Sequence, residues 1–190
     1  MLIVIVGNSC SGKTTLRQEL AKLGYVTIEA SDYFRKAKKF WTTQSNLPLN
    51  IWGMELLLKE KGALLDNAII TGIRTNEEVE YLKNHFELIV IALLTSEEKS
   101  YERAIIRSRE QIGSFKEFLD NVIRVDEEIG LRDLISNADK YIQNNENNLL
   151  EFVSRSIKII EPYIVNISKI TENSLGHSRV GENGINSSTA

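Results

Sequence analysis

Short apolar runs recur along the chain and are separated by amphipathic stretches. Leu2–Val6 and Leu88–Leu94 are unbroken runs rich in β-branched residues, which is typical of strands buried on both faces of a parallel sheet. Weaker runs at 25–28, 68–71 and 140–143 predict three further strands. The pattern therefore predicts a five-stranded parallel sheet.

The stretches between these runs have helical periodicity. Residues 13–22 place Leu16 and Leu20 on one face, and residues 76–84 do the same with Val79 and Leu82. Residues 97–110 follow a Thr95-x-x-Glu98 pattern, which predicts a capping box, and 146–161 predicts a closing helix. Alternating strands and helices predict an α/β doubly wound fold with helices on both faces of the sheet.

The 190 residues suit a single domain, which we expect to span 1–163. The segment 31–62 is longer than a simple crossover needs and contains aromatic residues among lysines, so we expect a substrate lobe there. After Pro162 the chain becomes rich in Asn, Ser, Gly and Thr, which predicts a disordered tail at 168–190.

Composition narrows the class of partner. The formal net charge is −3, which gives no field strong enough to recruit nucleic acid or an anionic membrane. One cysteine and two histidines exclude an intrachain disulfide and leave a structural zinc cluster without ligands. The longest apolar run is much shorter than a bilayer span. We therefore expect a cytoplasmic protein with no nucleic-acid or membrane partner, and a homodimer stays open.

The strongest chemical signal is the segment 7–14, which reads Gly-Asn-Ser-Cys-Ser-Gly-Lys-Thr and matches G-x-x-x-x-G-K-[ST]. It lies between an apolar run and an amphipathic helix, the context that identifies a P-loop. Its amides and the helix N-terminus attract phosphate, its lysine bridges the outer phosphates, and its threonine offers a hydroxyl to magnesium. The expected ATP-binding residues are Gly7, Asn8, Ser9, Cys10, Ser11, Gly12, Lys13, Thr14 and Thr15. Cys10 is either a small loop filler or a redox switch, because helix N-termini lower a thiol pKa.

Further segments give the chain a family resemblance. With the P-loop, 29–32 (Glu-Ala-Ser-Asp), 71–74 (Thr-Gly-Ile-Arg) and the arginines of 101–110 make it similar to the P-loop nucleotide kinases. It resembles in particular the dephospho-CoA-kinase-related and adenylate-kinase-like proteins of archaea, and the kinase-like domain of some deoxycytidylate deaminases. The stretches 72–79 and 137–142 support the resemblance, which covers roughly residues 1–161. It implies a three-layer P-loop fold and a phosphotransferase that uses ATP and Mg²⁺.

The resemblance also implies roles for residues that follow the second and third strands. Asp32 would orient the acceptor or hold the metal together with Thr14, although Ser31 or Asp32 could instead cap a helix. Arg35 and Arg74 would bind the acceptor, the planar guanidinium of Arg74 matching a phosphate, although Arg74 could instead pair with a nearby glutamate.

The resemblance further implies a lid at 96–125, and the arginines of this region are the next candidates. Arg103, Arg107 and Arg109 would close over the donor and neutralise the transferring group, or would form a solvated charged face. Asn144 follows the fifth strand, where related kinases contact the donor base. The expected catalytic residues are therefore Lys13, Asp32, Arg103, Arg107 and Arg109.

Two tryptophans complete the candidates, since Trp41 and Trp52 could stack on an acceptor base, or pack the lobe onto the sheet. A flat base and a phosphate together fit a nucleoside or deoxynucleoside monophosphate as the small-molecule partner. Dephospho-CoA and a noncatalytic nucleotide-sensing module are the alternatives. The sensing module is favoured by Thr71, because many kinases of this type carry an acidic residue there.

Overall fold

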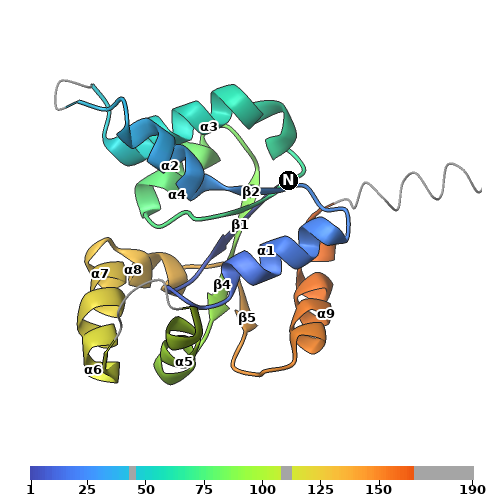
Figure 1. Ribbon diagram of the computed structural model, residues 1–190. Helices are drawn as coiled ribbons and strands as arrows, with labels where there is room; N and C mark the ends of the chain where they lie inside the picture. Colours follow the sequence, from blue (N-terminus) through green and yellow to red (C-terminus); the bar gives the residue numbers. More distant parts are fainter. Residues whose placement is uncertain (43–45, 108–112, 165–190) are drawn as a thin grey trace, which may run out of the picture.

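The computed structural model describes residues 1–42, 46–107 and 113–164. Its centre is a five-stranded sheet, entirely parallel, with the strand order β2-β3-β1-β4-β5 (Figure 1). This confirms the predicted fold class. The strands are β1 (Leu2–Val6), β2 (Thr27–Glu29), β3 (Ile69–Thr71), β4 (Leu88–Leu94) and β5 (Lys140–Gln143).

The sheet has a core on each face because alternate residues of its strands point in opposite directions. In β1, Ile3 and Ile5 face the layer of α1 (Lys13–Lys22) and α9 (Leu149–Ile160). Leu2, Val4 and Val6 face the opposite layer, which contains α3 (Leu49–Leu65), α4 (Asn76–Lys83) and α8 (Leu131–Ser136) (Figure 1). An unbroken apolar strand is therefore required in the central position.

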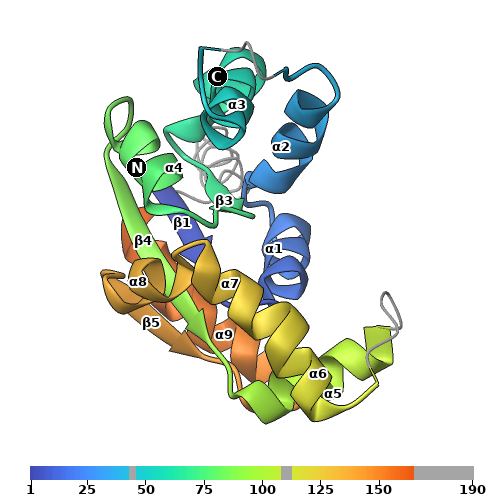
Figure 2. The same ribbon diagram turned by 90° about the vertical axis from the view of Figure 1, so that its left-hand side faces the viewer.

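The remaining elements form two projections from the sheet (Figure 2). One is the expected lobe, in which α2 (Ala30–Lys38) packs on α3. The other belongs to the expected lid region. It consists of α5 (Glu97–Arg107), α6 (Phe115–Phe118), the π-helical turn η1 (Leu119–Ile123) and α7 (Arg124–Glu128). A 3₁₀ turn, η2 (Glu161–Tyr163), follows α9.

The predicted bounds need correction at four elements. The second strand begins at Thr27 and includes Glu29, because its register with β3 pairs Glu29 with Thr71. The closing helix begins at Leu149, after Asn148, whose side chain accepts a hydrogen bond from the backbone N–H of Glu151. The third strand begins at Ile69, one residue later than predicted, and the helix after it ends at Lys83, one residue earlier. The predicted tail at 168–190 lies outside the described residues.

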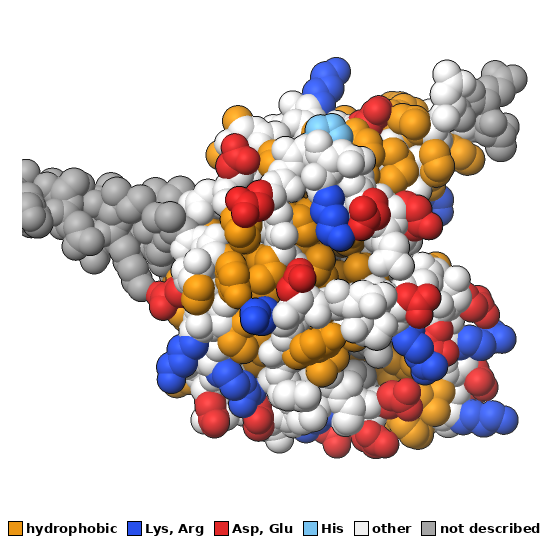
Figure 3. Space-filling view, turned by 180° about the vertical axis from the view of Figure 1, so that it is seen from behind, with side chains coloured by type: hydrophobic (Ala, Val, Ile, Leu, Met, Phe, Trp, Pro, Cys, Tyr) orange, Lys and Arg blue, Asp and Glu red, His pale blue; other side chains and the backbone are white. Residues whose placement is uncertain are grey.

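The surface carries charged side chains of both signs (Figure 3). The face seen from behind carries acidic and basic side chains interspersed over its lower half (Figure 3). Within the described ranges, no helix combines the length and the apolar character needed to cross a bilayer.

The sheet topology positions the site. From β1 the chain passes to β2 on one side, whereas β4 pairs with β1 on the other side. Ligands of open α/β sheets bind at the carboxyl ends of the strands where connections diverge in this way. The segment 7–14, Glu29, Arg74, Thr95 and Asn144 all follow or end strands at that edge.

Candidate active site

The segment between β1 and α1 has the backbone of a phosphate-binding loop. Gly12 has φ 102° and immediately precedes α1, and a Cβ there would overlap the side-chain amide of Asn144. Cys10 has φ 63°, and its side chain packs beside the cluster of Ala104 and Phe118. The loop thus combines left-handed backbone with close packing, the conditions under which amides can converge on an anion.

Lys13 lies inside the loop. Its Nζ donates hydrogen bonds to the carbonyl oxygens of Gly7 (2.5 Å) and Asn8 (2.7 Å). Burial lowers the pKa of Lys13 to about 8, and the Asp126 carboxylate opposes this shift while Arg74 adds to it. The ammonium is therefore held at the centre of the loop, with charged groups of both signs around it.

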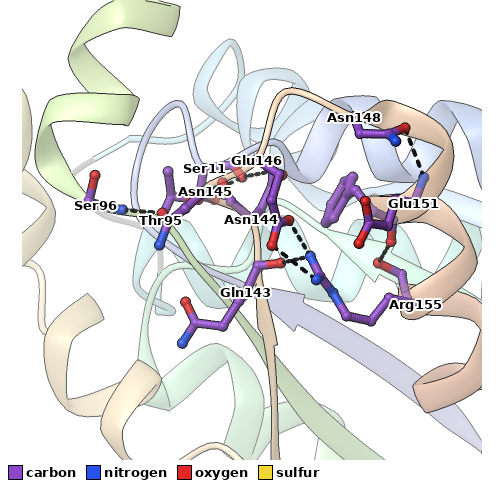
Figure 4. A network of polar contacts seen from close by, with 12 residues as sticks. Ser11, Thr95, Ser96, Gln143, Asn144, Asn145, Glu146, Asn148, Glu151 and Arg155 are labelled. Atoms are coloured by element: carbon purple, nitrogen blue, oxygen red, sulfur yellow. Dashed lines mark hydrogen bonds and ion pairs between the residues drawn. The ribbon is translucent and has the colours of Figure 1, made fainter.

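The carbonyl oxygen of Ser11 is the point at which other elements hold the loop. It accepts from Asn144 Nδ2 (2.7 Å), Thr95 Oγ1 (3.1 Å) and Arg103 Nη1 (3.3 Å). Figure 4 shows Asn144 and Thr95 beside Ser11. The predicted Thr95 capping box is therefore wrong. The hydroxyl of Ser96 caps α5 instead by accepting from the N–H of Lys99, because that of Thr95 donates to the loop.

Arg103 and Asn144 form one unit behind the loop. Arg103 Nη2 donates to the Asn144 carbonyl (2.9 Å) and its Oδ1 (3.2 Å), and desolvation lowers the pKa of the guanidinium. The connection from β5 to α9 is fixed in turn by Arg155, which binds Glu146 and the Gln143 carbonyl (Figure 4). The structure thus brings both predicted residues to the P-loop and gives Arg103 a loop-positioning geometry.

Arg103→Ala is expected to lower the free energy of unfolding by about 1.5–3 kcal/mol, the range for hydrogen bonds that involve a charged group. Urea unfolding measures the change. Arg124→Ala removes an arginine whose side chain is 64% exposed and should change stability by less than about 0.5 kcal/mol. Equal small effects in the two variants would show that Arg103 does not support the loop.

A cavity of about 330 Å³ lies on one side of the loop. Its wall combines apolar and amide side chains from three segments of the chain. They are Cys10, Thr15, Ile106, Asn144, Leu149 and Phe152. Arg103, Arg107 and Glu146 also line this cavity. Apolar and amide groups beside a P-loop, with charged groups at the border, suit a nucleotide base.

A larger cleft of about 500 Å³ lies at the mouth of the loop. Lys13 and Thr14 form its floor, together with Gly7. Guanidinium groups from four elements and three carboxylates face the same space. They are Arg17, Arg35, Arg74, Arg107, Glu29, Asp32 and Asp126.

Asp32 lies in the first turn of α2, and Glu29 holds the N-cap position without a side-chain cap bond, so neither Ser31 nor Asp32 caps this helix. Asp32 is 57% exposed and forms an ion pair with Arg35, and Arg35 also contacts Ser31 Oγ. The two predicted residues therefore lie together at the cleft.

Arg74 and Arg107 line the cleft. Within the described residues, no ion pair involves either guanidinium. Glu78 accepts from the backbone N–H of Arg74 (2.9 Å) and caps α4, so its carboxylate is engaged with backbone groups. The Arg74 charge opposes the rise that burial causes in the pKa of Glu78. Arg107 lines both cavities. Arg109 lies outside the described residues.

The tryptophans have a different setting. Trp41 Nε1 donates to the Leu47 carbonyl (3.0 Å) across the connection between α2 and α3. Neither Trp41 nor Trp52 lines the two cavities described above. This geometry favours the packing alternative for Trp41.

Sequence reasoning missed three cleft residues. Arg17 lies four residues after Lys13 and so shares its helix face, a signal that was available. Glu29 ends β2, where its register partner is Thr71. Asp126 is 2% exposed and accepts from the Ser9 N–H (2.7 Å), a contact across 117 residues that no local pattern indicates.

The pKa of Lys13 predicts a pH dependence. Below about pH 8 the ammonium is present in the free protein, whereas above it nucleotide binding must take up a proton. The affinity for ADP should therefore fall with rising pH, approaching about tenfold per pH unit well above pH 8. Calorimetry between pH 7 and 9.5 tests this. The residual binding of Lys13→Ala should lack this slope, and a constant wild-type affinity would contradict the expectation.

These features define the class of protein: a P-loop protein with a kinase-like fold. The same fold occurs in the shikimate kinase of Bacteroides thetaiotaomicron, with a TM-score of 0.62, 18% identity and coverage of 85% of this chain and 98% of that one. A sugar kinase from Janibacter gives a TM-score of 0.54 at 18% identity, with coverage of 84% and 93%.

Sequence comparisons define the family. A family model described as an AAA domain matches residues 3–117. A UPF0200 protein from Methanococcus maripaludis is 30% identical over 174 residues, covering 80% of this chain and 92% of the relative. The chain therefore belongs to the AAA-domain family of P-loop NTPases and, by this relative, to the UPF0200 family.

Proposed function

We propose that this protein transfers a phosphoryl group from ATP, with Mg²⁺, to a nucleoside or deoxynucleoside monophosphate. One observation carries the proposal. Arginines from α1, α2, α5 and the segment after β3 converge on the cleft that also contains Lys13 and Thr14. Arg17 and Arg35 pair with Glu29 and Asp32 there. Lys13, Arg74 and Arg107 leave an excess of positive charge that a nucleotide donor alone does not need.

The charge balance of the cleft supports an anionic acceptor. The guanidinium of Arg74 lowers the pKa of Lys13, so these two cations lie close enough to repel each other. Arg107 adds a third cation with no ion-pair partner among the described residues. Phosphate groups on donor and acceptor would relieve this repulsion, and arginine binds phosphate through paired N–H groups.

The chain's own groups have separable roles in the proposed transfer. Lys13 and the loop amides bind the donor phosphates, and Asp32 with Arg35 lies where an acceptor would be oriented. Arg107 would stabilise charge on the transferring group from its position between the two cavities. Thr14 and nearby carboxylates offer only oxygen atoms, the ligands that magnesium prefers. Magnesium, when bound, neutralises charge on the outer phosphates.

The proposal is tested by product identification. Purified protein is incubated with ATP and Mg²⁺ and with each of four acceptor types: nucleoside monophosphates, deoxynucleoside monophosphates, dephospho-CoA and shikimate. Mass spectrometry should detect a nucleoside diphosphate derived from the acceptor. Formation of CoA or shikimate phosphate alone would replace the proposed acceptor, and ATP binding without any phosphorylated product would favour a nucleotide-sensing module.

A further inference from the structure

Glu29 lies at the junction of the two strands that border the cleft. It is the last residue of β2, and its register partner is Thr71, the last residue of β3. Its side chain lines the cleft together with Lys13 and Thr14. Of the three carboxylates in the cleft, it is the one that the sheet itself positions, because Asp32 and Asp126 come from helices.

Hydroxyl groups and a glycine fix the Glu29 carboxylate. Oε1 accepts from Ser31 Oγ (2.7 Å), and Oε2 accepts from the fully buried Thr71 hydroxyl (2.8 Å). Arg17 Nε lies 3.5 Å from Oε2. Gly72 has φ +87°, and a Cβ there would overlap Oε1. The two hydroxyl donors and the close approach of Gly72 thus hold the carboxylate in one orientation. The Glu29 side chain is 17% exposed.

The other two carboxylates are placed differently. Asp32 is 57% exposed and paired with Arg35, so its position depends on a flexible surface ion pair. Asp126 Oδ2 accepts from the Ser9 N–H at 2.7 Å and is thereby tied to the loop backbone. A metal ligand shell requires carboxylates that are oriented beforehand, because outer-shell contacts set the direction of the groups that bind the ion.

We propose that Glu29, oriented by Ser31 and Thr71, is the carboxylate that holds hydrated magnesium next to the Thr14 hydroxyl. This inference rests on the proposed function. Magnesium dehydrates reluctantly and is usually held by one or two carboxylates together with substrate phosphates. The Thr71 hydroxyl then supports the Glu29 carboxylate on the neighbouring strand. The cleft therefore keeps a carboxylate for magnesium even though residue 71 is not acidic.

The test measures binding and does not depend on turnover. Calorimetry gives the affinity for a nonhydrolysable ATP analogue in EDTA and in magnesium. Magnesium should strengthen binding to the wild type. Glu29→Gln should reduce this enhancement about tenfold or more and leave the metal-free affinity within about threefold, in keeping with the effect of altered outer-shell ligands. Asp32→Asn and Asp126→Asn remove the same charge from the same cleft and should retain most of the enhancement.

A second test moves the carboxylate from position 29 to position 71. Glu29→Thr should lose the enhancement, and adding Thr71→Asp should restore part of it, because the two positions are register partners with side chains in contact. Far-ultraviolet circular dichroism and urea unfolding establish that each variant is folded. If the double variant does not fold, the comparison of Glu29→Gln with Asp32→Asn and Asp126→Asn decides the question.

The outcomes separate the two proposals. A wild type that does not bind the ATP analogue overturns the proposed function. A wild type that binds the analogue without any magnesium effect, or a Glu29→Gln protein that keeps the full effect, overturns the assignment of Glu29 alone. Equal losses in all three single variants would indicate a general electrostatic effect and would also overturn it.

Discussion

Lys13→Ala should weaken ATP binding by a factor between about a hundred and a thousand, equivalent to about 3–4 kcal/mol. The ammonium lies inside the loop, where desolvation strengthens its attraction to phosphate. The fold should be retained because Lys13 is the first residue of α1, and alanine has high helix propensity. Calorimetry measures the affinity, and any turnover should fall with it.

Lys36→Ala provides the matched control for Lys13→Ala. Lys36 is an exposed lysine of α2 that pairs with Glu60, and it does not line the cleft. Its replacement should leave ATP affinity within about twofold, because exposed ion pairs contribute little. Unchanged ATP binding in a folded Lys13→Ala protein would overturn the P-loop assignment.

Arg107→Ala should lower turnover by about a hundredfold or more while leaving donor affinity nearly unchanged. Arg107 borders both cavities and has no ion-pair partner among the described residues. A cation that meets its charge only in the transition state affects kcat more than ground-state binding, and arginine fingers have effects of this size. Steady-state kinetics with the acceptor that product identification selects gives kcat, and calorimetry gives donor affinity.

Arg103→Ala separates the two arginines of α5 that the structure describes. Because Arg103 contacts the Ser11 and Asn144 backbones, its loss should appear in stability and donor affinity before it appears in kcat. If Arg107→Ala retains turnover within a few fold, the end of α5 is a solvated charged face and the catalytic role of Arg107 is wrong.

The central strands and α1 could be predicted from local pattern. β1, β4 and α1 have the predicted bounds because burial on both faces, or on one helix face, leaves a continuous or periodic apolar signal. The edge strand β5 also has the predicted bounds, although Ile142 is the one buried residue among its four. β2 is a three-residue strand, and its register with β3 decides its bounds. A register is a long-range property, and so the sequence placed this strand too early.

In the candidate site, too, some residues could be predicted from local motifs, whereas others depend on long-range packing. The P-loop motif specifies its own geometry, and the carboxyl edge of the sheet brings Asp32, Arg74 and Asn144 to it, as the fold class implies. Asp126 contacts Ser9 through the packing of α7, and the local sequence around either residue does not predict this contact.

Thr95 shows how tertiary contacts override local rules. Its spacing to Glu98 is that of a capping box, yet its hydroxyl donates to the carbonyls of Ser11 and Asn144 and leaves the cap to Ser96. Trp41 likewise satisfies its indole N–H within the lobe. The acceptor assignment therefore rests on the arginines and does not depend on the tryptophans.

Acceptor-dependent ADP release is the most direct test of phosphoryl transfer in this cleft. Wild-type protein is assayed with ATP, Mg²⁺ and each nucleoside or deoxynucleoside monophosphate, alongside Lys13→Ala and Arg107→Ala. We predict that one monophosphate accelerates ADP release by at least tenfold over ATP alone, and that both variants lose this acceleration. ATP binding with no acceleration by any acceptor, or acceleration that persists in Lys13→Ala, would contradict the account.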